Sequence, residues 1–155
     1  MFLLNILLAM AWVALTGEFT AGNFTIGFII VYALLALTRP SSSARSYTDR
    51  VRRIFSFSLF FLKELVMSSL WVTVQVLSPT FKMTPAVVAV PLDIRGDAGI
   101  TLLGNLITLT PGTLTLEVAE DQSQIFVHAM HVDDVAAFRQ EIKQGFERRI
   151  IEVMQ

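Results

Sequence analysis

Two apolar stretches open the chain and constrain its fold more than any other feature. Phe2–Leu15 is interrupted by a single asparagine, and Phe24–Leu37 by a single threonine. Helices of about 2–19 and 21–38 would each have roughly 18 residues and rise roughly 27 Å, which spans the hydrocarbon core of a bilayer. The sequence therefore predicts an N-terminal transmembrane helical hairpin.

Composition and charge support a membrane protein with two different parts. Hydrophobic residues make up 54% of the chain and charged residues 16%, against roughly 25% charged in an average soluble domain. Residues 1–78 carry six basic and three acidic groups, a net charge of +3, whereas residues 79–155 carry six basic and ten acidic groups, a net charge of −4. The overall charge of −1 gives no reason to expect a nucleic-acid partner. The absence of cysteine excludes disulfides and thiolate metal sites.

The segment after the second apolar stretch predicts the orientation. Arg39–Arg53 contains five arginines and one acidic residue. Basic loops stay on the cytoplasmic side, so we expect this loop and the N-terminus inside the cell. Pro40 is expected to end the second helix.

A third apolar segment, residues 54–78, has two interpretations that the sequence leaves open. Glu64, Ser68, Trp71 and Gln75 recur at steps of four, three and four, which places them on one stripe of a helix. In the first interpretation, the helix lies along the cytoplasmic membrane interface and this stripe is exposed to water. In the second, the helix spans the membrane and the stripe packs against partner subunits.

The pattern changes to that of a small soluble fold at residue 86. We expect an α+β domain over residues 86–155 with the order β-α-β-β-α, following a membrane region over residues 1–78. Asp97 is predicted to cap the first helix of this domain, and Asp133 or Asp134 the second. The predicted elements are strands Val87–Ile94, Thr113–Val118 and Gln124–Val132, and helices Ala98–Leu109 and one that ends near Met154.

No constellation of residues predicts catalysis. His128 and His131 are the only histidines, and three residues apart on a strand they point to opposite faces. Lys63 and Glu64 are the best candidates for ion handling, because ionisable groups at membrane depth are often functional. Their side chains diverge by about 100° on a helix, so we expect no mutual salt bridge and favour a structural role.

Residues 103–116 carry a longer motif. The run Leu-Gly-Asn-Leu-Ile-Thr-Leu-Thr-Pro-Gly-Thr-Leu-Thr-Leu closely resembles the signature of the E subunit of the Mrp-type (also Mnh or Pha) multi-subunit sodium/proton antiporters. Phe61–Leu65, Val90–Leu92 and Ile125–Val132 are similar to the same family. Gly104 stands where alanine is expected. The resemblance covers essentially the whole chain.

The resemblance implies a non-catalytic accessory subunit of a bacterial cation/proton antiporter, which couples sodium efflux to proton uptake and serves pH homeostasis. It implies a multi-pass protein of the cell (inner) membrane with a cytoplasmic C-terminal domain, no cofactor, and other antiporter subunits and membrane lipid as partners, with the transported ions handled mainly by the larger subunits. The alternative is a free-standing, membrane-tethered sensor or binding module with a cytoplasmic ligand-reading domain. The candidate structural or partner-interface residues are Lys63, Glu64, Gln75, Asn105, Thr108, Thr110, Pro111, Gly112 and Thr113.

Overall fold

The computed structural model describes residues 1–38, 42–78 and 83–154, and these form two compact units, Met1–Ile54 and Phe55–Gln155. Pro40, which was expected to end the second helix, lies outside the described residues. The first unit contains helices α1 (Phe2–Thr16) and α2 (Ala21–Thr38) and the beginning of α3 (Ser42–Leu77).

Helices α1 and α2 pack closely against each other. The indole nitrogen of Trp12 donates a hydrogen bond to Asn23 Oδ1 over 3.0 Å. A Cβ atom added at Gly27 would lie 2.7 Å from the Trp12 ring, so only glycine permits this approach. Helix α1 ends at Thr16 with Gly17 in the left-handed conformation at φ 74°. The prediction that this helix runs to residue 19 was therefore wrong, because Gly17 supplies a C-terminal cap.

Helix α3 begins earlier than the sequence predicted. It was expected over residues 54–78, yet it starts at Ser42 and is continuous to Leu77. The expectation of a loop up to Arg53 was wrong, because Ser42–Arg53 contains neither glycine nor proline and arginine is a good helix former. Within the described residues, only the segment Tyr47–Leu77 is long and apolar enough to cross a membrane by length and composition.

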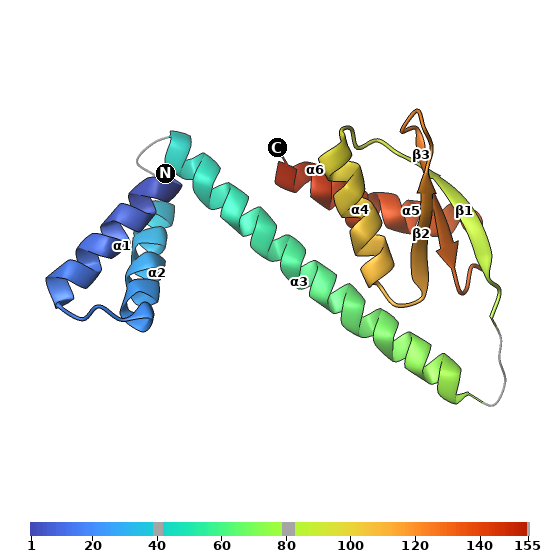
Figure 1. Ribbon diagram of the computed structural model, residues 1–155, viewed down its shortest axis with the longest axis horizontal. Helices are drawn as coiled ribbons and strands as arrows, with labels where there is room; N and C mark the ends of the chain where they lie inside the picture. The colour runs from blue at the N-terminus through green and yellow to red at the C-terminus, as the bar shows by residue number, and fades with distance from the viewer. Residues whose placement is uncertain (39–41, 79–82, 155) are drawn as a thin grey trace. The chain divides into compact units, whose positions relative to one another are not determined.

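The second unit holds a three-stranded antiparallel sheet in which β3 (Gln124–Ala129) lies between β1 (Ala86–Pro91) and β2 (Thr113–Val118) (Figure 1). Helix α4 (Asp97–Leu109) connects β1 to β2, and a C-terminal helix follows β3. The predicted order β-α-β-β-α is present. The buried cluster lies between one face of the sheet and these helices, and it is formed chiefly by Val88, Val90, Leu103, Ile107, Ile125, Val127, Ile142, Phe146 and Ile150.

Several element ends differ from the sequence prediction. Gly96, not Asp97, is the N-cap residue of α4, since Asp97 already has helical geometry. Strand β3 ends at Ala129 rather than at Val132. Asp134 caps the C-terminal helix by accepting a hydrogen bond from the Ala136 amide over 2.7 Å, which is one of the two capping residues predicted.

The C-terminal helix is interrupted by a wider turn. Its segments are α5 (Val135–Ile142), a π-helical turn (Lys143–Glu147) and α6 (Arg148–Met154). The apolar positions Phe138, Ile142, Phe146 and Ile150 are four residues apart. Four residues overshoot one α-helical turn by about 40°. The extra residue in the π-helical turn corrects this drift and keeps the apolar side chains on the core.

Candidate functional site: the groove between α3 and the C-terminal domain

Aromatic contacts fix one end of α3 against the C-terminal domain. The rings of Phe60 and Phe146 meet edge to face, with centroids 5.6 Å apart. The guanidinium carbon of Arg149 lies 3.8 Å from the centroid of the Phe60 ring, within the range of a cation–π interaction. Phe57 and Phe61 also pack against the core of the domain. Part of α3 therefore completes the hydrophobic core of the second unit.

A second contact lies about three turns further along α3. The Trp71 indole lies against the His131 imidazole, with centroids 5.5 Å apart. His131 Nδ1 is 3.0 Å from Thr84 Oγ1, and His131 Nε2 is 3.0 Å from Asp133 Oδ2. Because both ring nitrogens have partners, the imidazole is held in one orientation and forms a fixed surface for the indole.

Between these contacts lies a groove with a volume of about 430 Å³. Glu64, Ser68 and Trp71 line it from α3, and the turn Thr110–Thr113 lines it from the domain, together with Glu141. The structure thus brings the polar stripe of α3 next to the Thr-Pro-Gly-Thr turn, two features that the sequence had selected separately.

The Thr-Pro-Gly-Thr turn is held by its own side chains. Thr110 Oγ1 donates to the Leu106 carbonyl over 2.9 Å. Thr113 Oγ1 donates to the Ile107 carbonyl over 2.6 Å and lies 3.0 Å from the Thr110 carbonyl. Gly112 has φ 95°, a conformation that other residues rarely adopt. These bonds satisfy carbonyls at the end of α4, so the turn is a structural corner.

The remaining candidate residues do not line this groove. Thr108 serves the fold, because its hydroxyl accepts a hydrogen bond from the Thr115 amide over 3.1 Å. Asn105 is exposed on α4, and Gln75 is half-buried on α3. Lys63 is 71% exposed.

Lys63 and Glu64 do approach each other, contrary to the prediction. Lys63 Nζ lies 3.9 Å from Glu64 Oε1. The long lysine side chain bends around the helix and so overcomes the angle between neighbouring residues. The pair is exposed on the lysine side and contributes little to stability.

Glu141 is the ionisable group of the groove with a perturbed pKa. Desolvation raises the pKa of Glu141, and the negative charge of Glu64 raises it further. The two carboxylates also face a second hollow that is lined by Phe60 and Arg149. Protonation of Glu141 therefore favours the docked arrangement of α3 and the domain.

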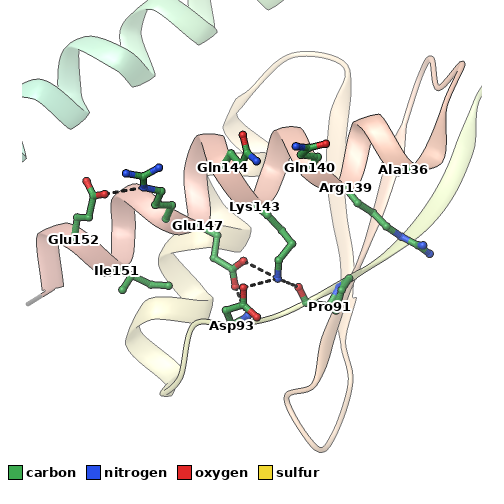
Figure 2. A pocket seen from close by; sticks show the side chains of 11 residues that line it. Pro91, Asp93, Ala136, Arg139, Gln140, Lys143, Gln144, Glu147, Ile151 and Glu152 are labelled. Atoms are coloured by element: carbon green, nitrogen blue, oxygen red, sulfur yellow. Dashed lines mark hydrogen bonds and ion pairs between the residues drawn. The ribbon is translucent and has the colours of Figure 1, made fainter.

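A charged network around the buried Glu147 was missed by the sequence analysis (Figure 2). The Glu147 side chain is 2% exposed, and its Oε1 accepts hydrogen bonds from the amides of Asp93 (2.6 Å) and Ile94 (2.9 Å). Lys143 Nζ lies 3.3 Å from Glu147 Oε2 and 2.8 Å from Asp93 Oδ2, and donates to the Pro91 carbonyl over 2.9 Å.

The network ties the C-terminal helix to the end of β1. Burial lowers the pKa of Lys143, but the hydrogen bond to Asp93 and the charge of Glu147 outweigh this effect and raise the pKa overall. The four-residue spacing of Lys143 and Glu147 was visible in the sequence, yet a surface pair has the same spacing. Glu147 lies in the π-helical turn, where it is buried next to Phe146.

The acidic and histidine side chains are not arranged as a metal centre in the described ranges. Across these ranges, no group of three or more histidine, cysteine, aspartate or glutamate side chains could hold a metal ion. His128 lies on β3 opposite Val87 and Leu114, whereas His131 lies beyond the strand. The groove is thus lined by apolar side chains together with the carboxylates of Glu64 and Glu141.

Comparison with known proteins extends this description. The family described as Na+/H+ ion antiporter subunit matches residues 5–153. The chain is 35% identical to the E subunit of the Na(+)/H(+) antiporter of Alkalihalophilus pseudofirmus over 97% of this chain and 96% of that protein. It is 33% identical to the protein of the same name from Bacillus subtilis, with the same coverage.

Two solved structures contain similar chains. A chain of the membrane-bound sulfane sulfur reductase, an archaeal respiratory membrane complex, superposes with a TM-score of 0.59 at 27% identity and covers 98% of both chains. A chain of the Mrp complex from Dietzia sp. DQ12-45-1b gives a TM-score of 0.52 at 30% identity, covering 66% of this chain and 96% of that chain. The chain therefore belongs to the family of Na+/H+ antiporter E subunits.

Proposed function

We propose that the chain is an accessory subunit of a multi-subunit Na+/H+ antiporter and has no catalytic role. The names of the curated relatives and the Mrp complex support the antiporter assignment. The observation that carries the accessory role is the distribution of charge. Helices α1 and α2 contain no Asp, Glu, Lys or Arg, and Glu64 lines a groove formed with the chain's own C-terminal domain. A relay of protons needs a chain of ionisable groups or water.

The proposed role is to stabilise the assembled complex. Helices α1 and α2 provide a compact apolar pair, and the docking of α3 on the C-terminal domain provides a rigid second unit. Transported Na+ and H+ pass through partner subunits, because two or three helices cannot enclose an ion path.

The proposed location is the bacterial cell (inner) membrane, with α1 and α2 as the spanning hairpin. Helix α1 rises roughly 22 Å and α2 roughly 27 Å. Helix α2 is long enough to span the hydrocarbon core, whereas α1 is shorter, so we expect local thinning of the bilayer beside α1. The basic segment before residue 54 and the C-terminal domain face the cytoplasm. A cysteine introduced at Ser123 should not react with an impermeant thiol reagent in intact cells. Labelling at this position would refute the proposed orientation.

Native purification tests the function. The tagged full-length chain, extracted in mild detergent, should migrate as one stable assembly whose other bands are antiporter subunits by mass spectrometry. Deletion of the chain should lower the amount of that assembly. A monomer or homo-oligomer would instead support a free-standing sensor or binding module.

A further inference from the structure

Helix α3 has two faces of opposite character within the second unit. Phe60, Glu64 and Trp71 face the C-terminal domain, where they contact Phe146 or line the groove. These positions lie within about 40° of one another around the helix at 100° per residue. Glu64, Ser68 and Trp71 of the polar stripe therefore face the chain's own domain.

The opposite face carries what we call the apolar stripe. Its members are large hydrophobic residues separated by steps of four, three, four, four and seven, and they are between 49% and 78% exposed. This spacing keeps all of them on one side of a helix over a rise of roughly 33 Å. The apolar stripe consists of Phe55, Leu59, Leu62, Val66, Leu70 and Leu77.

The contact with the domain argues against a simple transmembrane path for α3. The domain touches α3 from Phe57 to Trp71, which is a rise of roughly 21 Å. If this stretch crossed the bilayer, the domain residues beside it would enter the hydrocarbon with their charges. Arg149 and Asp133 would then be placed within the hydrocarbon, where charged side chains are strongly disfavoured.

The charges on α3 indicate what covers the apolar stripe. Arg50 and Arg52 are exposed and precede Phe55, the first residue of the stripe, by five and three residues. Lys63 lies at the margin of the stripe and is 71% exposed, so that its apolar stem can lie along lipid while its ammonium group reaches the headgroups. Helices with an apolar face and basic flanks bind in the plane of anionic membrane surfaces.

We infer that α3 lies in the plane of the membrane–water interface, with its apolar stripe in the acyl-chain boundary of anionic phospholipid and the C-terminal domain on its aqueous side. The occupant of the stripe is thus lipid rather than a partner subunit. The inference goes beyond the proposed accessory role and rests on the membrane location proposed above.

Depth measurements on single-cysteine variants of the full complex test the inference. The chain has no cysteine of its own, so a label at Leu59, Val66, Leu70 or Leu77 reports one position, and the complex without an introduced cysteine gives the background of its partners. An environment-sensitive fluorophore is attached, and the complex is reconstituted in vesicles of phosphatidylethanolamine and phosphatidylglycerol that carry nitroxide lipids at a shallow or a deep acyl position.

A flat helix predicts strong quenching by the shallow nitroxide at all four positions, with the same ratio of shallow to deep quenching along the helix. A label at the exposed Ser123, in the turn between β2 and β3, serves as the control and should not be quenched. A ratio that falls to a minimum near Val66 and rises again toward Leu77 would show a spanning helix and overturn the inference. Absence of lipid quenching at all four positions would show that a partner subunit covers the stripe, which overturns it equally.

Discussion

The indole of Trp71 rests against the imidazole of His131, 5.5 Å from centroid to centroid, and joins α3 to the end of the domain sheet. His131 is in turn held by Thr84 and Asp133. One aromatic residue of α3 is thus matched to a ring whose orientation is fixed by hydrogen bonds. The contact closes the groove at the end opposite Phe60, and its removal should loosen that end alone.

Trp71→Ala should weaken docking of α3 by about 1–2 kcal/mol, because an aromatic pair contributes about 0.5–1.5 kcal/mol beyond the area it buries. Hydrogen exchange of the amides of Met130–Val132 in the purified protein measures this, with an acceleration of roughly tenfold expected. Val74→Ala, at a position 66% exposed, is the matched control and should leave exchange unchanged. If the exchange rates of these amides in the Trp71→Ala variant equalled those of the unsubstituted protein, the contact would contribute nothing to docking.

Gly112→Val should disrupt the corner between α4 and β2. The residue at this position needs φ 95°, which is the source of the strain, because an added Cβ would lie at an ordinary 3.5 Å from Val72 Cγ2. A β-branched residue at positive φ costs about 1–3 kcal/mol. The amount of assembled complex, measured on native gels, should fall. Gly104→Ala is the control, since its Cβ would meet Thr115 at an ordinary 3.5 Å. Normal assembly of the valine variant would rule out a structural corner.

Glu147→Ala should destabilise the C-terminal domain by about 3 kcal/mol, because it leaves Lys143 and two backbone amides without their buried partner. Exchange of the Ile125 and Val127 amides in the core strand reports the free energy of unfolding. Glu152→Ala removes an exposed i,i+4 pair with Arg148 and should cost less than about 1 kcal/mol. Similar losses in both variants would contradict the role given to the buried network.

Docking of α3 should strengthen as the pH falls. The folded-state pKa of Glu141 is raised above its ordinary value of 4.5 by desolvation and by Glu64. The contribution of this group to stability is therefore fully present below pH 4.5 and is lost as the pH rises through the raised pKa. Glu141→Gln should remove this dependence and tighten docking at neutral pH. Hydrogen exchange of the groove over a pH series, corrected for intrinsic rates, checks both effects. If the pH dependence of docking were unchanged in the glutamine variant, it would have to arise from a group other than Glu141.

The sequence predicted the elements whose pattern is local. Strand β2 was predicted with its observed bounds, Thr113–Val118, because polar and apolar residues alternate and a Pro-Gly turn precedes it. The bulge between Thr115 and Glu117 was not foreseen. A single extra residue shifts the register but leaves the composition of the strand unchanged.

The early start of α3 escaped prediction because hydropathy marks where a helix becomes apolar rather than where it begins. Glu147 was missed for a different reason. Its carboxylate is bound by the amides of Asp93 and Ile94, which are more than 50 residues away in the chain, so no local pattern marks it as buried. The groove likewise requires contacts between α3 and the turn at Gly112 that no single segment encodes.

The exchange activity of Glu64→Gln tests the central claim, that this chain supports the antiporter without carrying its ions. The amide retains the size of the side chain but cannot carry a proton at ordinary pH. Sodium-driven pH exchange in everted vesicles, normalised to assembled complex, should be nearly normal in Glu64→Gln, whereas Glu64→Leu should lower the amount of assembled complex by placing an apolar group in the groove. Loss of exchange at full assembly in Glu64→Gln would show that the chain takes part in the ion path.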